Sequence, residues 1–442
     1  MIKNSYILQS EMNTQEPYTA LNGEYVLSLS DAKIYFTDGK FTRNFISVNT
    51  GDKIIDGSAA SITVKIDKDP GSGISVFNIA ENMKDLTFRN IKLNIRYKGG
   101  MTGNTVYGFK NHSYRLTVKD CKIDFLAENQ INYTAIHNDG KLDTHLGTPA
   151  DCLTVFGNHI TANQTAQEIS KESVFCGIDN VSANSVSISN NYIFIKNTGS
   201  SEDQQAIGVR NSGWHMRLEN NNIKGNGSHI SGNLLEQAHA YGVYNIGNYM
   251  IFTGNNCVGE WGGKCVGLYN SGMYANITGN KILATHTIMG RSVVIKAERN
   301  ILSGNIITNT SRNPHFVEVL SRSNIITNNY IQGLMFMKDL KSGCGIFIAG
   351  EESKKIEGCN ISNNIFGDIK DFGIVLINTQ RNIIQGNHLA MANGAETYTA
   401  IYAKSQDDII SDNVTNENTG ASDAELADKL YRNYDQAVCS LV

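Results

Sequence analysis

The stretch Ile188-Ser-Asn-Asn191-Tyr-Ile193 is one copy of a six-residue pattern that recurs along most of the chain. The pattern reads apolar, any residue, Gly, Asn or Asp, then Asn, any residue, apolar. Its central asparagines are Asn158, Asn191, Asn221, Asn255, Asn280, Asn305, Asn329, Asn364, Asn387 and Asn413. Such self-similarity is the signature of a repeat architecture, in which each unit buries its apolar face only against its neighbours.

Successive asparagines are 23 to 35 residues apart, with a base period near 24. Each Asn stands between two short apolar runs, where the chain bends sharply and Asn tolerates the left-handed conformation. Its amide can bond its equivalents one coil above and below. We therefore predict an all-β, single-stranded, right-handed parallel β-helix of about 12 coils. The prediction assigns 1–60 to an N-terminal cap of strands, 61–415 to the solenoid, and 416–442 to a C-terminal helical cap or oligomer contact.

The ends of the chain break the period in ways that suit caps, since a solenoid must cover its open sheet edges. Short strands are expected at 25–29 and 33–36, and the only convincing helix at 422–435. The long coils carry their extra residues at 124–150, 161–175, 196–205, 225–240 and 333–344. Binding residues concentrate on such loops, so these insertions join the search for a site.

Composition excludes several classes of function. The net charge of −4 implies no basic surface for nucleic acid, and no window has the ~18 apolar residues of a membrane span. The N-terminus lacks the pattern of a signal peptide, and the eight cysteines form no C-x-x-C pair. Phosphate-loop, dinucleotide and zinc-protease motifs are missing. We therefore expect no metal site and no cofactor.

A second pattern, Gly-apolar-X-Asn, precedes the ladder pattern in five coils and ends at Asn111, Asn180, Asn211, Asn245 and Asn270. Strand alternation predicts that Phe109, Ile178, Val209, Val243 and Leu268 point inward. The glycines are then expected on the outer flank together with Lys110, Asp179, Arg210, Tyr244 and Tyr269. Aligned positions in two further coils add Lys296 and Glu318. Such a row predicts a shallow trough with a backbone floor for a sugar chain.

Further candidates lie close to this flank in the sequence. Tyr241, Trp214 and Trp261 join Lys110, Tyr244 and Tyr269 as expected substrate-binding residues, although a packed corner explains either tryptophan equally well. Inserted segments add His137, Asp139, His145, Glu202, Asp203, Glu236 and His239.

The asparagine repeat and its flanking aliphatic stack resemble the right-handed parallel β-helix superfamily, over about residues 75 to 415. Its members are pectate lyases, pectinases, uronate epimerases, inulin fructotransferases and bacteriophage tailspikes. The resemblance implies a polysaccharide or oligosaccharide partner. The Asn-Thr-Asp and Gly-His-Gly motifs of pectinases and the calcium-binding Asp cluster of pectate lyases are absent here. A tailspike or depolymerase type would imply a homotrimer and an extracellular or virion-surface location.

Three functions stay open from the sequence. The leading one is a glycoside hydrolase acting on a bacterial surface or other complex polysaccharide, which needs two carboxyl groups across the scissile bond. Asp179 and Glu318 lie several coils apart, so a partner such as Glu202, Asp203 or Glu236 would be required. The second is a polysaccharide lyase or uronate epimerase, with base and cation drawn from Arg210, Tyr244, Tyr269 and Lys296. The third is a glycan-binding solenoid without catalysis.

Overall fold

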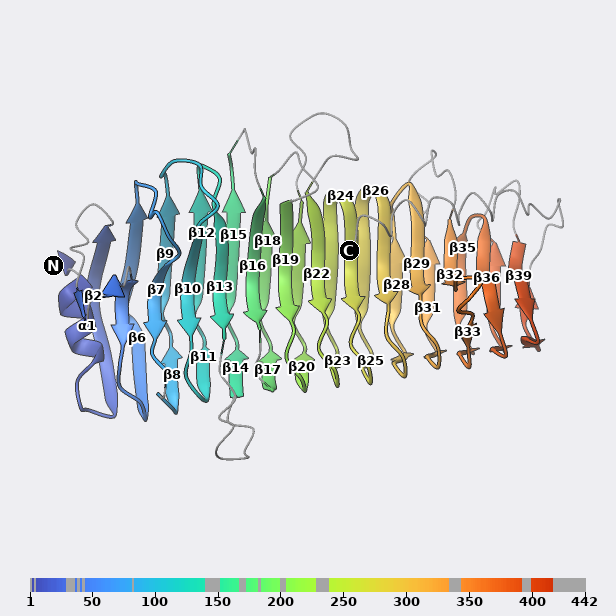
Figure 1. Ribbon diagram of the computed structural model, residues 1–442, viewed down its shortest axis with the longest axis horizontal. Coiled ribbons are helices and arrows are strands. Elements are labelled where there is room, and N and C mark those ends of the chain that lie inside the picture. The colour runs from blue at the N-terminus through green and yellow to red at the C-terminus, as the bar shows by residue number, and fades with distance from the viewer. Residues whose placement is uncertain are drawn as a thin grey trace.

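The chain winds into a right-handed parallel β-helix in the computed structural model, with its axis horizontal in Figure 1. The structure describes residues 2–3, 5–28, 36–37, 40–41, 44–81, 83–139, 152–166, 172–181, 184–198, 204–227, 238–333, 343–391 and 399–415. Among these, every strand pairs in parallel with its equivalent one coil away, apart from an antiparallel pair and an isolated bridge. The predicted fold class is confirmed.

Three sheets run along the axis. The flank sheet, on which the second sequence pattern lies, contains β5 (Asn44–Val48), β7 (Ile74–Ile79), β10 (Thr105–Asn111), β13 (Asn132–Asn138), β16 (Ser173–Asn180), β19 (Gln204–Asn211), β22 (His239–Asn245), the second halves of β24 (Asn256–Asn270) and β26 (Lys281–Ile295), β29 (Asn313–Val319), β32 (Cys344–Ala349), β36 (Phe372–Gln380) and β39 (Thr399–Gln406).

The short sheet follows the flank sheet in each coil. It contains the first half of β6 (Lys53–Ile66), β8 (Leu86–Arg89), β11 (Leu116–Lys119), β14 (Cys152–Phe156), β17 (Ser185–Ser189), β20 (Met216–Glu219), β23 (Ile251–Thr253), β25 (Asn276–Thr278), β27 (Ile301–Ser303), β30 (Ile325–Thr327), β34 (Asn360–Ser362), β37 (Ile383–Gln385) and β40 (Ile409–Ser411). Strand β33 (Ile356–Glu357) pairs with the end of β36.

The third sheet closes the coil. It contains the end of β2 (Tyr18–Ser28), the second half of β6, β9 (Lys92–Tyr97), β12 (Lys122–Ala127), β15 (His159–Gln164), β18 (Tyr192–Lys196), β21 (Asn222–Asn226), the first halves of β24 and β26, β28 (Ile306–Asn309), β31 (Tyr330–Gly333), β35 (Ile365–Ile369), β38 (His388–Met391) and β41 (Val414–Thr415).

The N-terminal end carries a helix that the sequence did not predict, α1 (Ser5–Met12). Its Leu8 and Met12 are fully buried within the main core, so α1 covers the first coil. Strand β1 (Ile2–Lys3) pairs in parallel with β2, and β3 (Phe36–Thr37) pairs with β4 (Lys40–Phe41). Parallel pairing therefore begins within the first 60 residues, through β2 and β6. The helix expected at 422–435 lies outside the described residues.

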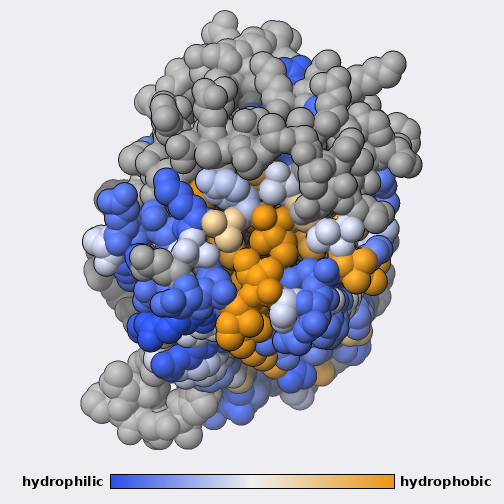
Figure 2. All heavy atoms as spheres, turned by 90° about the vertical axis from the view of Figure 1, so that its right-hand side faces the viewer, coloured by the Kyte–Doolittle hydropathy of each residue, from blue (hydrophilic) through white to orange (hydrophobic). Residues whose placement is uncertain are grey.

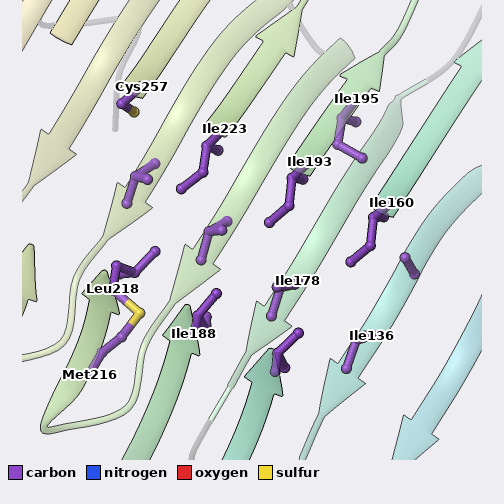
Figure 3. Close-up of a cluster of buried hydrophobic side chains, with 14 of the residues drawn as sticks. Ile136, Ile160, Ile178, Ile188, Ile193, Ile195, Met216, Leu218, Ile223 and Cys257 are labelled. Atoms are coloured by element: carbon purple, nitrogen blue, oxygen red, sulfur yellow. The ribbon is translucent and has the colours of Figure 1, made fainter. Parts of the chain in front are cut away.

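Stacked aliphatic side chains fill the interior. One such column runs through Ile160, Ile193, Ile223 and Cys257, which occupy equivalent positions on successive coils (Figure 3). All four are fully buried. Because each coil buries its apolar residues only against the coils beside it, such columns supply hydrophobic stabilisation that a single coil could not provide.

The predicted asparagine ladder is continuous from Asn158 to Asn413. Each side-chain Nδ2 donates to the Oδ1 of the next asparagine at 2.9–3.1 Å, and each backbone N–H donates to the same oxygen. We had expected the left-handed backbone conformation at the ladder asparagine itself. It belongs instead to the residue directly before each ladder asparagine, such as Asn190 or Gly254. This explains why the pattern places Gly, Asn or Asp there.

The C-terminal end of the solenoid shows its interior. In Figure 2 hydrophobic side chains form a band across the middle of this end, between hydrophilic sides. In the last coil Ile410, which is in register with the buried Ile384, is 44% exposed. The core column therefore continues to the last described coil. In the part of the chain that is described, no helix combines the length and the hydropathy needed to cross a bilayer.

Candidate active site on the flank sheet

Two outward columns of side chains run along the flank sheet. The first contains Lys110, His137, Asp179, Arg210, Tyr244, Tyr269, Val294 and Glu318, in register on successive strands. The second contains Tyr107, Thr134, Cys176, Ile207, Tyr241, Val266, Arg291 and His315. The residues predicted to point inward are all fully buried in the main core: Phe109, Ile178, Val209, Val243 and Leu268. Lys110, Asp179, Arg210, Tyr244, Tyr269 and Glu318 of the predicted row therefore share one outward column.

The glycines of the second pattern do not form the floor of a trough, contrary to the prediction. A Cβ on Gly208 would lie 2.3 Å from Cγ2 of the core residue Ile223, and one on Gly177 would lie 2.6 Å from Cγ2 of Ile193. Each glycine thus faces inward directly before another inward residue. The strands depart locally from strict alternation, as at a bulge, which the two-residue period could not predict.

A buried asparagine ladder ends these flank strands. From Asn111, the Nδ2 groups donate to the Oδ1 of the next member at 2.6–2.9 Å, through Asn138, Asn180, Asn211 and Asn245 to Asn270. Asn138 was absent from the pattern because its strand reads Ala135-Ile-His-Asn138, with Ala in place of Gly. For this reason the sequence assigned His137 to an insertion, whereas it belongs to the flank strand β13.

His137, Asp179 and Arg210 form one hydrogen-bonded cluster on three adjacent strands. Arg210 donates from Nε to Asp179 Oδ1 and from Nη2 to Oδ2, both at 2.7 Å, as a bidentate pair. Nδ1 of His137 lies 3.0 Å from the same Oδ2. The Asp179 side chain is only 2% exposed, while those of His137 and Arg210 are 14% and 34% exposed. The carboxylate is thus sealed beneath two groups that reach the surface.

The charges in this cluster determine the proton positions. Burial opposes ionisation of Asp179, but hydrogen bonds from Arg210 and His137 outweigh it and lower the pKa of the carboxyl to about 2. The pair with Asp179 raises the pKa of Arg210 above its usual value. An ionised carboxylate only accepts, so Nδ1 of His137 must donate to it. In a neutral imidazole this leaves Nε2 unprotonated and able to accept a proton.

Two more polar side chains adjoin this cluster from β10. The Tyr107 ring lies 5.0 Å from that of His137, centroid to centroid, and the Lys110 ammonium lies 5.2 Å from the centre of the Tyr107 ring. Lys110 was predicted as a binding residue, and Tyr107 was missed because it precedes the Gly-apolar-X-Asn pattern. A base, two cations and a phenol therefore gather over four neighbouring strands.

The predicted tyrosines form a second group, next to Arg210. Tyr244 and Tyr269 stack face to face with ring centroids 4.6 Å apart, and Tyr241 meets Tyr244 edge-on at 5.3 Å. Tyr241 and Tyr269 are buried and pack with Cys176, Ile207, Val266 and Val294. Burial is the largest cause of the raised pKa values of Tyr244 and Tyr269. At neutral pH these phenols therefore stay protonated.

Lys296 lies two residues beyond the position at which the sequence aligned it. Val294, not Lys296, is in register with Tyr269. The lysine still reaches back, with its ammonium 5.5 Å from the centre of the Tyr269 ring. The glycine-based alignment failed here because Ser292 replaces the glycine in this strand.

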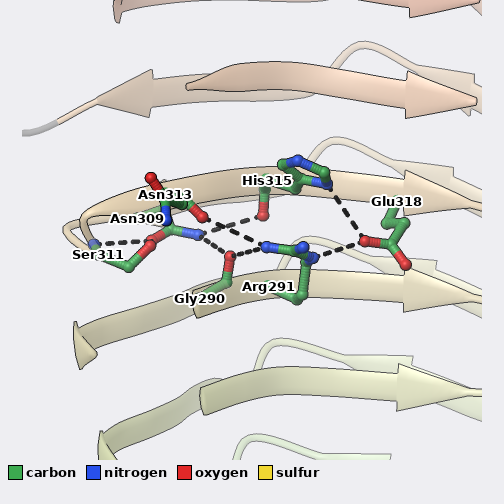
Figure 4. A network of polar contacts seen from close by, with 7 residues as sticks. All are labelled: Gly290, Arg291, Asn309, Ser311, Asn313, His315 and Glu318. Carbon is green, nitrogen blue, oxygen red and sulfur yellow. Dashed lines mark hydrogen bonds and ion pairs between the residues drawn. The ribbon is translucent and has the colours of Figure 1, made fainter. Parts of the chain in front are cut away.

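Glu318 belongs to a third cluster, five coils from Asp179. Its Oε2 accepts from Nε of Arg291 at 2.6 Å and lies 3.2 Å from Nδ1 of His315 (Figure 4). All three side chains are largely buried, and Arg291 also donates to the backbone carbonyls of Gly290 and Asn313. Arg291 and His315 lower the pKa of Glu318 to about 2 against the effect of burial. Glu318 is thus paired within the cluster, and we interpret the cluster as structural.

The buried His315 predicts a loss of stability in acid. Burial, followed by repulsion from Arg291, lowers its pKa from 6.5 to about 4. Between these values the unfolded chain binds a proton that the folded chain does not, so stability is present above pH 6.5 and falls as the pH drops towards 4. We expect His315 to contribute about 1–3 kcal/mol to this loss. Urea denaturation at pH 7.5 and 4.5 should show a larger decrease for the wild type than for His315→Asn; equal decreases would contradict the assignment.

Four of the remaining predicted residues lie in the part of the chain that the structure describes: Trp214, Trp261, Asp139 and His239. Trp214 lies in the turn between β19 and β20, and Trp261 stacks on His286 within β24 with centroids 4.3 Å apart. Asp139 pairs with His112 at 3.8 Å, and His239 starts β22. The loop residues His145, Glu202, Asp203 and Glu236 lie outside the described residues. Within the described ranges, no group of three or more His, Cys, Asp or Glu side chains could hold a metal ion.

No family model matches the sequence, and no curated protein does so at a significant level. Among solved structures, the A-module of the Azotobacter vinelandii mannuronan C-5 epimerase AlgE4 is similar, with 11% identity and a TM-score of 0.46 over 93% of this chain and 96% of that one. The periplasmic alginate epimerase AlgG shows 10% identity and a TM-score of 0.39 over 94% and 84%. A mutant tailspike of E. coli bacteriophage HK620, in complex with a pentasaccharide, shows 11% and 0.42 over 90% and 63%.

Proposed function

We propose that the flank sheet removes the proton next to the carboxylate of a uronic acid residue within a polysaccharide. One observation carries the proposal: Asp179 holds His137 in the tautomer of a base and, through the same oxygen, fixes the guanidinium of Arg210 beside it. A base beside a fixed cation is what this reaction needs, because the proton leaves carbon while negative charge develops on the carboxylate.

The chemistry follows from the positions of these groups. The proton on the carbon next to the carboxylate passes to Nε2 of His137, and the electron pair of the broken C–H bond moves into the carboxylate as an enolate. Arg210 neutralises that charge with hydrogen bonds to the two oxygens, while Asp179 stabilises the imidazolium. Asp179 acts through its neighbours and is a positioning residue.

Two fates of the enolate give two products. If the electron pair expels the oxygen at the glycosidic bond, the chain is cleaved and an unsaturated uronate forms, as in a lyase. If a proton returns to the same carbon from the opposite face of the ring, the configuration at that carbon is inverted, as in an epimerase. Lys110 and Tyr107 are the groups beside His137 that carry a proton to donate. Both fates share the same first step.

Glycoside hydrolysis fits the described residues less well. A hydrolase needs one protonated carboxyl group. The two carboxylates of the first outward column, Asp179 and Glu318, both have a pKa of about 2 and are engaged in ion pairs. Burial raises the pKa of Asp371 to about 6, but this group lies at the start of β36, beyond Glu318, and accepts from the backbone N–H of Gly343. No pair of carboxylates converges on the described flank.

Product analysis tests the proposal. Incubation with alginate, the polymer for which the similar epimerases are named, and with a panel of uronate-containing capsular polysaccharides should give an unsaturated, ultraviolet-absorbing uronate or an inverted sugar. New reducing ends without unsaturation would support a hydrolase instead, and binding without any chemical change would leave only a glycan-binding solenoid. The proposal includes the extracellular or virion-surface location expected from the sequence.

A further inference from the structure

A groove of about 630 Å³ lies on the short sheet, away from the flank columns. Its lining comes from β14, β17, β20 and β23 and from the turn before β25. Thr154, Ser187, Arg217 and Ile251 occupy one outward column of this sheet, in register. The groove therefore extends over five coils, about 19 Å at the spacing of parallel strands. Such a length suits a linear polymer better than a single small molecule.

One wall of the groove is a stack of aromatic rings. His215 and Tyr249 stack with centroids 5.0 Å apart, and Tyr249 and Tyr274 with centroids 5.1 Å apart. Trp214 leans on this stack, 6.5 Å from His215 and 6.2 Å from Tyr249, and is 52% exposed. Three consecutive coils thus present aromatic side chains to solvent, which folding alone would not favour.

The turn does not require aromatic residues. His215, Tyr249 and Tyr274 all have φ between 53° and 60°, the left-handed conformation, which costs an ordinary side chain of order 1 kcal/mol. Equivalent turns in other coils satisfy the same geometry with Arg115, Arg299, Ser323, Arg381 and Asp407. Aromatic residues replace these polar ones beside the groove, which is where a ligand would meet them.

The lining indicates the class of ligand. Hydroxyl groups of Thr154 and Ser187, the guanidinium of Arg217 and exposed aromatic rings together match a pyranose, which has apolar C–H faces and a polar rim. Arg217 is the one lysine or arginine in the lining, and Glu219 lies 3.6 Å from it. A nucleic acid or an anionic membrane would need several cations, so these partners are excluded by charge.

We propose that this groove is a second glycan-binding site, which holds a linear pyranose polymer against Trp214 and Arg217. The site is separate from the His137 cluster and takes no part in its chemistry. A polysaccharide that contacts both this groove and the flank sheet would have a higher effective concentration at the protein surface. The inference does not depend on which reaction the flank carries out.

Tryptophan fluorescence tests the site directly, because the chain has only two tryptophans. In a Trp261→Phe protein, which keeps a ring against His286, all tryptophan emission comes from Trp214, and excitation at the red edge of the absorption band avoids the tyrosines. Titration with alginate and with dextran, as acidic and neutral probes, should give a saturable change with at least one of them and should protect Trp214 from iodide quenching. Adding Arg217→Ala should weaken that apparent affinity about tenfold.

Two comparisons keep the outcome decisive. Adding Arg210→Ala to the reporter protein should leave the Trp214 signal intact, since this change lies on the flank sheet. Failure of the flank chemistry with an intact Trp214 signal would thus overturn only the proposed function. The second site would be overturned if Trp214 gave no saturable response to either probe. It would also be overturned if Arg217→Ala left the affinity unchanged while its circular dichroism spectrum showed an intact fold.

Discussion

Replacing His137 with Ala should lower the turnover of a uronate polymer by about 10²–10⁴-fold, the usual contribution of a general base. The imidazole is the one group in the cluster that is held by a carboxylate through Nδ1 and retains Nε2 for the substrate. Initial rates on the polymer found by product analysis measure the effect. Because the side chain is partly exposed at the surface of β13, the fold should survive the change.

His159→Ala is the matched control for this prediction. His159 is also a strand histidine, but it lies on β15 in the third sheet and stacks on Tyr192. Its removal should leave turnover unchanged. Asp179→Asn should lower the turnover nearly as much as His137→Ala does, because the amide lacks the charge that orients the imidazole and fixes Arg210. Full activity in His137→Ala would show that another group takes the proton.

The largest effect on stability is expected at the centre of the main ladder. Oδ1 of Asn255 accepts from both the backbone N–H and the Nδ2 of Asn221, and its own Nδ2 donates to the carbonyl of Leu218 and to Asn280. Asn255→Ala leaves several buried groups without partners, each of which costs about 1–3 kcal/mol. We expect the free energy of unfolding to fall by about 3–5 kcal/mol.

Urea denaturation followed by circular dichroism measures this loss. Asn256→Ala is the control, because this side chain donates one exposed hydrogen bond, to Asn222. Its loss should lower the free energy of unfolding by less than about 1 kcal/mol. Equal shifts of the two variants would mean that the ladder contributes no more than an ordinary surface asparagine.

The solenoid could be predicted because its sequence signal is repeated in every coil. The period, the ladder asparagines and the inward residues of the flank strands all follow from a turn that must recur at one place. The exceptions have physical causes. The flank glycines point inward because the strands are locally irregular. Helix α1 was missed because its described side chains include only two that are fully buried, Leu8 and Met12.

The candidate site could be predicted only in part. Asp179, Arg210 and Lys110 were found through their strand positions. His137 was named only as a residue of an insertion, because Ala135 breaks the glycine pattern and hides β13. Side-chain pairing across coils depends on register, which a single sequence gives only approximately. That is why Lys296 was misaligned with Tyr269, and why the internal pairing of Glu318 with Arg291 was not anticipated.

Solvent exchange tests the central claim most directly. The reaction should be run in deuterium oxide with the polymer that product analysis identifies, and the sugar should be examined by nuclear magnetic resonance. Proton abstraction by His137 predicts loss of the hydrogen next to the carboxylate, either as deuterium at that carbon or as a double bond, and neither in His137→Ala. New reducing ends with that hydrogen fully retained would contradict the account.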